Sequence, residues 1–328
     1  MKFGPVSLEG AEGHILAHNI SDDEGRRVLR KGKILDAEGI RALRRLGYEE
    51  VFVAELEDGD VHEDEAAARV AASAAGDGVE VAPPHTGRVN LKAEERGVLA
   101  VDRVALERLN RVEGFTVATL PDRTVVRSGD RVATIKIIPY SVPEEAVSRA
   151  ESCAAERPIL SLRPIAPQPV GIVLVGSRGV WEALADGLGS AIRARVEGLG
   201  CTVSGMSFAP MEVAAVAGAL AEQAASGARL LVVAGETAIM DPDDVIPRGV
   251  RKAGGRVEHL GLAVDPGHLL LLAYLDGVPV VGAPGCVRSP SPDGFDMVLP
   301  RLLSGELLAR DDLQSLGHGG LLSDPRRR

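Results

Sequence analysis

Three carboxylates follow an apolar segment in the second half of the chain. The segment LLVVAG is followed by ETAIMDPDDVIP, so Asp241, Asp243 and Asp244 fall within four positions. Pro242 and Asp243 suit the start of a helix, because a carboxylate can accept the free N–H groups of a first turn. One cap needs one acid, however, and this loop offers three. The surplus favours either a metal ion or a ligand edge rich in N–H donors.

A second group of residues, in the stretch VPVVGAPGCVRSPSPDGFD, has the opposite character. Gly282 and Gly285 allow close backbone approach, and Arg288 and Ser289 provide hydrogen-bond donors. A helix that starts near Pro292 would point its N-terminus toward the same place. The pattern predicts an anion site, and the alternative interpretation is a tight turn without a ligand.

The elements that must position these residues begin at Val170, where apolar strands alternate with amphipathic helices. Continuous apolar runs such as LLVV and VPVV indicate strands covered on both faces, and the alternation indicates a mostly parallel sheet. We therefore predict a doubly wound α/β domain. Ligands of such sheets bind beyond the carboxyl ends of the strands, where the chain direction reverses. Four loops qualify, and they begin at Gly176, Ala234, Ala263 and Gly282.

The clearest domain boundary is the stretch RPILSLRPIAPQPVG, whose four prolines deny a helix and favour an extended connector. Before it, short segments with strand-like alternation are interrupted by two helices. We predict an N-terminal α+β region over residues 1–157, as one region or two small subdomains. A linker over 158–169, a ligand-binding domain over 170–308 and a tail over 309–328 complete the division.

Composition excludes several classes of protein. The 328 residues, 45% of them hydrophobic, are enough for two or three domains with cores. The net charge of −10 argues against a nucleic-acid partner, which requires clustered Lys and Arg. Three cysteines fit neither a disulfide framework nor a zinc site, so we expect a reducing, cytoplasmic location. The longest apolar run, Leu269 to Leu275, is too short for a membrane span, and the start of the sequence has no signal-like apolar segment.

Three segments together carry a family resemblance. In order, they are LVVAGETAIMDPDDVIP, GLAVDPGHLLLL and GVPVVGAPGCVRSPSPDGFDMVLPRLLSG. They resemble the molybdopterin-binding domain shared by the MoaB/Mog and MoeA proteins of molybdenum cofactor biosynthesis, and are closest to a branch associated with cofactor cytidylylation. The likeness covers Val170 to about Gly305, and segments such as TGRVNLKAEERGVLAVD extend it more weakly into the first half. It implies a three-layer α/β/α domain that binds molybdopterin or the molybdenum cofactor.

The resemblance also implies a set of site residues. Molybdopterin carries a phosphate, a dithiolene and a pterin edge with N–H donors, so its pocket should combine carboxylates with anion-binding glycine loops. Asp241, Asp243 or Asp244 would meet the pterin edge or a magnesium ion, with Asp241 and Asp244 as the metal ligands. No residue is assigned a catalytic role. The implied cofactor-binding residues are Gly235, Glu236, Thr237, Asp241, Asp243, Asp244, Asp265, Gly267, His268, Gly282, Pro284, Gly285, Arg288 and Ser289.

Two positions depart from the family pattern. Glu236 stands in a loop that the molybdotransferases keep as glycine, where its side chain would crowd a phosphate, and His268 replaces a usual Asn. Binding or carrying the cofactor tolerates these changes better than molybdate insertion does. The rival hypotheses are a non-catalytic cofactor-sensing regulator and a nucleotide-derivative hydrolase on the same fold. The implied partners are the pterin ligand and a cofactor nucleotidyltransferase or a molybdoenzyme, and an open sheet edge would permit self-association.

Overall fold

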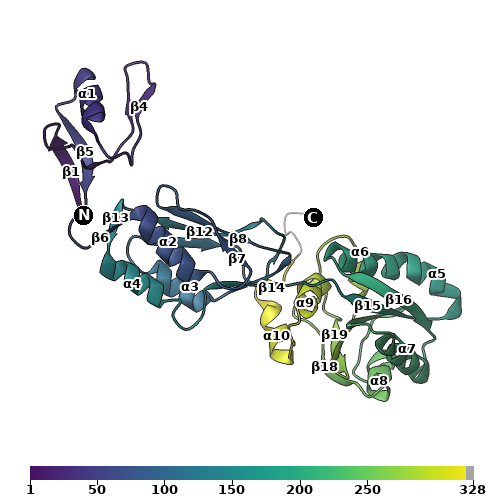
Figure 1. The fold of residues 1–328 in the computed structure, drawn as a ribbon. Coiled ribbons are helices and arrows are strands. Elements are labelled where there is room, and N and C mark those ends of the chain that lie inside the picture. The colour runs from purple at the N-terminus through teal and green to yellow at the C-terminus, as the bar shows by residue number, and fades with distance from the viewer. Residues whose placement is uncertain (323–328) are drawn as a thin grey trace. The chain divides into compact units, whose positions relative to one another are not determined.

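The computed structural model describes residues 1–322 and divides into two compact units (Figure 1). The N-terminal unit spans Met1–Arg163 and the C-terminal unit begins at Pro164. Strand β14 (Leu160–Pro164) occupies part of the stretch predicted as a linker, and residues 323–328 of the predicted tail lie outside the described residues. No helix among residues 1–322 combines the length and the apolar composition needed to cross a membrane.

The first part of the N-terminal unit is a small sheet covered by one helix. Its strands lie in the order β1-β5-β2, and the sheet packs against α1 (Ala37–Arg45) around the buried Leu43, Val51 and Val53. The Asp36 side chain caps α1 by accepting a hydrogen bond from the Gly39 N–H. The strands of this part are β1 (Lys2–Ser7), β2 (Ile15–Leu16), β3 (Ile20–Ser21), β4 (Arg27–Leu29) and β5 (Glu50–Glu55).

A second buried cluster, which includes Val70, Leu91 and Ile135, organises the rest of the N-terminal unit. A four-stranded sheet of order β10-β12-β8-β7 carries short helices and is accompanied by the smaller sheets β11-β9-β14 and β13-β6. This short-stranded α+β content is the predicted one. The elements are β6 (Asp60–His62), α2 (Glu63–Ala74), β7 (Val79–Val81), β8 (Arg88–Ala93), β9 (Gly97–Val101), α3 (Arg103–Asn110), β10 (Phe115–Thr119), β11 (Val125–Val126), β12 (Arg131–Ile137), β13 (Ser141–Pro143) and α4 (Glu144–Ser152).

The C-terminal unit is built on a six-stranded sheet of order β16-β15-β17-β20-β19-β18. Strands β16, β15, β17 and β20 run parallel, whereas β19 runs antiparallel to both β20 and β18. The predicted mostly parallel α/β domain is thereby confirmed, and the apolar run after His268 supplies the antiparallel strand. The strands are β15 (Pro169–Val175), β16 (Thr202–Ala209), β17 (Leu230–Gly235), β18 (Arg256–Leu260), β19 (Leu271–Leu275) and β20 (Val278–Gly282).

Helices cover both faces of this sheet (Figure 1). On one face, α7 (Val213–Ala225) and α8 (Val245–Lys252) bury Val173, Leu231 and Val233. On the other, α5 (Trp181–Leu184) continues through a π-helical turn into α6 (Ser190–Gly198). Gly189 in that turn packs against Met206, and a Cβ there would lie 2.8 Å from Met206 Cε, so a larger residue would displace the end of that flexible side chain.

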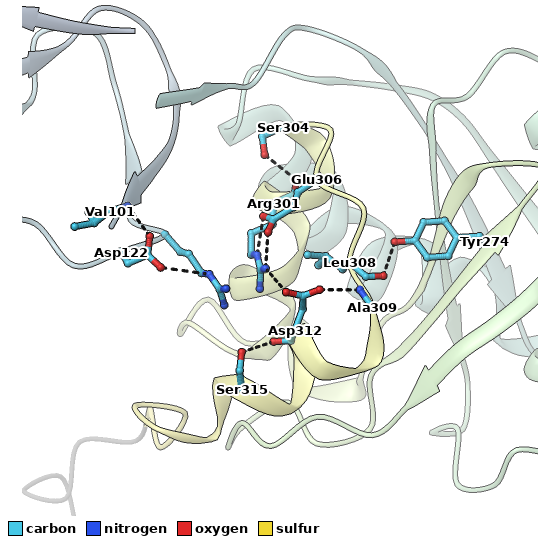
Figure 2. Close-up of polar contacts among 11 residues, drawn as sticks. Val101, Asp122, Tyr274, Arg301, Ser304, Glu306, Leu308, Ala309, Asp312 and Ser315 are labelled. Atoms are coloured by element: carbon cyan, nitrogen blue, oxygen red, sulfur yellow. Dashed lines mark hydrogen bonds and ion pairs between the residues drawn. The ribbon is translucent and has the colours of Figure 1, made fainter. Parts of the chain in front are cut away.

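The C-terminal segment is held to the domain by a buried arginine on α9 (Gly294–Leu303) (Figure 2). Only 1% of the Arg301 side chain is exposed, and Glu306 accepts two hydrogen bonds from its guanidinium at 2.9 and 2.6 Å. Asp312 on α10 (Arg310–Gln314) lies 3.5 Å from the same group and also accepts from the Ala309 N–H. These contacts of Asp312 therefore hold in place the first part of residues 309–328, which the sequence suggests form a tail.

Candidate functional site

The exits of three parallel strands bring the predicted loops together at one edge of the sheet. Val175 at the end of β15 pairs with Gly235 at the end of β17, and Val233 pairs with Gly282 at the end of β20. From β15 the chain moves outward to β16 and then returns to β17 on the other side. The direction therefore reverses between β15 and β17, which is where sheets of this kind bind ligands.

The three carboxylates of the second loop form turns and a helix cap. Asp244 caps α8, since its Oδ1 accepts from the Val245 N–H at 2.7 Å and its Oδ2 from the Met240 N–H at 3.2 Å. Asp241 Oδ1 accepts from the Asp243 N–H at 2.8 Å, and the exposed Asp243 carboxylate lies 3.5 Å from Arg251. Asp244 is thus committed to structure, while Asp241 and Asp243 remain exposed to solvent.

Asp244→Ala is expected to lower the free energy of unfolding of the C-terminal unit by about 1 kcal/mol, because the first turn of α8 loses its cap. Asp241→Ala removes one hydrogen bond in an exposed turn and should cost less than about 0.5 kcal/mol. Denaturant unfolding followed by the fluorescence of Trp181, the single tryptophan, measures both. Equal losses in the two variants would contradict the assignment of the cap to Asp244.

A small pocket lies where the β15 and β17 exits meet the start of α8. It is a narrow crevice that leaves no room for a water molecule. Gly235 is one of the lining residues. A Cβ there would lie 2.6 Å from the Thr237 carbonyl oxygen, so the loop turns too tightly for a side chain. The pocket is lined by Val175, Met211, Gly235, Thr237, Ala238, Ile239, Asp244, Val245 and Ile246.

The glycines of the fourth loop serve different purposes. Gly282 faces the protein, since a Cβ there would lie 2.6 Å from Ile239 Cδ1 and 2.7 Å from Leu271 Cβ. Gly285 is exposed and has open space around it, and it begins a 3₁₀ turn capped by the buried Pro284. Close backbone approach to a ligand is therefore available at Gly285 and not at Gly282.

The two predicted donors of the fourth loop, Arg288 and Ser289, differ in whether they already contact another residue. The Arg288 guanidinium is exposed and forms no ion pair with any carboxylate of residues 1–322. Ser289 Oγ accepts a hydrogen bond from the Ser291 N–H at 3.2 Å. Arg288 is consequently available to an anion from solvent.

Arg195, which the sequence does not single out, holds this loop in place. It extends from α6 and donates to the carbonyl oxygens of Val287 at 2.9 Å and Ser289 at 2.8 Å. Its Nε donates to Asp296 Oδ1 at 2.9 Å. The Arg195 side chain is 14% exposed. Its bonds to Val287 and Asp296 are partly buried, whereas its bond to Ser289 lies at the surface. Nothing local in the sequence marks this role, because the acceptors lie 92 or more positions away along the chain.

Cys286 and Asp293 are neighbours on the protein-facing side of the fourth loop. Asp293 is fully buried and forms a reciprocal capping box with Asp296 at the start of α9. Burial raises the pKa of the Asp293 carboxyl, and burial together with that neighbouring carboxylate raises the pKa of the Cys286 thiol to about 11. The thiol is therefore protonated at neutral pH, which disfavours a role as nucleophile.

The third loop joins the site through two glycines. Gly267 has a φ of +136°, and a Cβ there would lie 2.5 Å from the Gly294 backbone nitrogen. The Gly294 N–H donates to the Pro266 carbonyl oxygen at 2.9 Å, which fixes this loop at the start of α9. Asp265 and His268 are exposed, and His268 Nδ1 lies 3.6 Å from Asp265 Oδ1. Both side chains are thus accessible beside the fourth loop.

The magnesium expectation for Asp241 and Asp244 gains no support from this geometry. Asp244 uses both oxygens, and Asp241 one, to accept backbone N–H groups. Within residues 1–322, no group of three or more His, Cys, Asp or Glu side chains is placed to hold a metal ion. The assignment of magnesium to Asp241 and Asp244 therefore stays a prediction.

Three of the solved structures similar to the chain are of molybdenum cofactor biosynthesis proteins. One from Pyrococcus furiosus aligns with 94% of this chain at 13% identity and a TM-score of 0.27, and the chain covers 66% of its length. A MoeA protein from Pyrococcus horikosii aligns with 93% of the chain and 75% of its own length, at 13% identity and a TM-score of 0.32. The MoaB enzyme of Thermus thermophilus aligns with 42% of the chain and 98% of its own length, at 19% identity and a TM-score of 0.31.

Different families match a part of each of the two units. Residues 5–55 match a domain of unknown function, DUF8806. No curated protein matches the chain. Residues 171–304 match the family described as a probable molybdopterin binding domain. This match agrees, over residues 171–304, with the molybdopterin-binding domain that the sequence predicts.

Proposed function

We propose that the C-terminal unit binds molybdopterin, or the molybdenum cofactor formed from it, during cofactor biosynthesis in the cytoplasm. The observation that supports this most is that exposed carboxylates and an arginine without an ion pair to the described residues follow the neighbouring strands β17 and β20 at one edge of the sheet. That edge includes the reversal between β15 and β17, in a domain that matches the molybdopterin-binding family. Carboxylates accept from the N–H donors of a pterin edge, and arginine binds phosphate.

The hydrogen bonds that each side chain already makes suggest how the ligand is oriented. Asp244 serves as a cap, so Asp241 and Asp243 are the carboxylates that we assign to the pterin edge. Arg288 and the open backbone at Gly285 are assigned to the phosphate. Glu236 and Thr237 lie on the same loop as the carboxylates, and Asp265 and His268 lie on the third loop, on the other side of the fourth; we include all four in the proposed site. This orientation of the ligand requires no metal at Asp241 and Asp244.

We further infer that the protein carries the cofactor and does not insert molybdate. Glu236 places a carboxylate in a loop that would have to accept a second anion during insertion, and like charges at close range oppose each other. A carrier would pass the cofactor to a nucleotidyltransferase, as the cytidylylation branch suggests, or to a molybdoenzyme.

Copurification tests the proposed function directly. The chain is isolated from a host that makes the cofactor, and the bound material is oxidised and identified by mass and pterin fluorescence. A stoichiometric pterin is the expected result. Protein that is folded, as shown by a cooperative unfolding transition, but contains no pterin and binds none when it is added would refute the proposal.

Arg288→Ala is expected to weaken binding of phosphorylated molybdopterin by about 1.5–3 kcal/mol, the contribution of a hydrogen bond to a charged group. The dephosphorylated ligand should bind both proteins equally. Calorimetry with the two ligands measures the difference, and Arg229→Ala is the matched control, since it removes the same charge from an exposed residue at the amino edge of the sheet. Equal losses for both ligands would exclude phosphate from the Arg288 end.

A further inference from the structure

The Glu236 carboxylate is bound to the loop that follows β15. Glu236 Oε2 accepts from the Ser177 N–H at 2.8 Å and from Ser177 Oγ at 3.1 Å. The backbone of the two loops is joined as well, because the Glu236 N–H donates to the Val175 carbonyl oxygen at 2.8 Å. Glu236 thus links the loops that follow β15 and β17, the two strands between which the chain direction reverses.

The neighbouring backbone is shaped around this carboxylate. A Cβ on Gly176 would lie 3.1 Å from Glu236 Oε2 and 2.8 Å from Leu184 Cδ1, so glycine makes room for the charged group. Both Glu236 and Ser177 are exposed, so the carboxylate binds these donors in contact with water. An anion from solvent can therefore reach the same place.

The residue that follows Ser177 is a cation, Arg178, whose guanidinium does not contact the Glu236 carboxylate. The Arg178 guanidinium lies over the Trp181 ring, 5.6 Å from its centroid, and Trp181 in turn stacks on Phe208 with a centroid distance of 5.3 Å. Contact with the ring restricts the guanidinium. Arg178 forms no ion pair with a carboxylate in the described part of the chain, so its charge is uncompensated by direct contact.

The Ser177 N–H and Oγ bind the Glu236 carboxylate, and the next residue along the chain adds a positive charge that no carboxylate of residues 1–322 contacts. A backbone N–H, a hydroxyl and a guanidinium are the groups that bind phosphate oxygens in proteins. We propose that Ser177 and Arg178 form a phosphate subsite, and that Glu236 is an internal anion that occupies this subsite and opposes binding of phosphate groups. Glu236 is then a residue that selects ligands by charge.

Replacing Glu236 by glutamine separates this role from a purely structural one. Glutamine keeps an oxygen that can accept from Ser177 and loses the negative charge, so the link between the loops can persist. Inorganic phosphate should bind Glu236→Gln roughly fivefold to tenfold more tightly than the wild type, as expected for one charge pair at close range in water. Glu236→Ala, which frees the donors completely, should show at least the same gain.

Titrations of the full chain with inorganic phosphate at constant ionic strength provide the test. Trp181 fluorescence reports on the loop, since it is the single tryptophan and contacts Arg178. The chemical shift of the Ser177 amide gives a second measurement. Glu212→Gln is the matched control, because Glu212 is exposed after β16 at the same edge and its side chain does not cap α7.

The expected result is a gain in both Glu236 variants, none in Glu212→Gln, and loss of the gain when Ser177→Ala or Arg178→Gln is added to Glu236→Ala. An unchanged affinity in the Glu236 variants overturns the proposal, as does an equal gain in Glu212→Gln or a gain that survives removal of Ser177 Oγ and Arg178 together. Because phosphate alone is the probe, the outcome does not depend on whether the chain binds a pterin.

Discussion

Glu306→Ala is expected to destabilise the C-terminal unit by about 3–5 kcal/mol, because it leaves the buried Arg301 charge without its main partner. Glu306 accepts both of the short hydrogen bonds from the guanidinium, which is 1% exposed. Asp312, 3.5 Å away, still compensates part of the charge and places the loss toward the lower end of that range. Denaturant unfolding of the full chain, followed by Trp181, reports on the C-terminal unit alone, since the single tryptophan lies there.

A paired replacement is the control for this measurement. Arg301→Met combined with Glu306→Leu removes both charges and keeps similar volume, so it should remain within about 2 kcal/mol of the wild type. A double variant as unstable as Glu306→Ala would show that packing, and not the uncompensated charge, accounts for the loss.

Gly267→Ala should have the largest effect of any glycine replacement at the candidate site. A side chain at a φ of +136° is strained, and its Cβ would lie 2.5 Å from the Gly294 backbone nitrogen. Left-handed backbone costs a residue with a Cβ about 1–2 kcal/mol and overpacking adds about 1–3 kcal/mol. We expect a loss of about 3 kcal/mol and displacement of the third loop from the start of α9.

Gly261→Ala provides the comparison, because it changes conformation without the clash. Gly261 has a φ of +100°, but the nearest atom to a Cβ there is 4.0 Å away. Its loss should stay near about 1–2 kcal/mol. Unfolding followed by Trp181 measures both variants, and equal losses would mean that the contact between Gly267 and Gly294 relaxes freely.

The centre of the sheet was predictable because β15, β17 and β20 carry apolar runs. A short run such as LLVV at Leu230, bounded by glycines and alternating with helical segments, is typical of a strand covered on both faces, and the helix after Asp243 has a recognisable cap. The antiparallel position of β19 was not predictable, since an apolar run of that length does not encode the direction of its neighbours.

The candidate site was predictable only as far as its loops. Residue types at the strand exits identify Asp241 and Arg288 as candidates, but they do not show which carboxylate caps a helix. Gly282 illustrates the limit, because a glycine that packs against Ile239 and Leu271 has the same sequence signature as one that approaches a ligand. The bond between Glu236 and Ser177 joins residues 59 positions apart, so no local pattern reveals it.

Arg195 holds the fourth loop through backbone atoms, so the backbone conformation of that loop does not depend on which side chains it carries. Arg195 donates to the carbonyl oxygens of Val287 and Ser289, which every amino acid possesses. Substitutions among the exposed residues 288–291 can therefore change the charge and shape presented to a ligand without moving the backbone. Natural variation or laboratory libraries at these positions would then sample new ligand preferences on an unchanged scaffold, provided that Arg195 is kept.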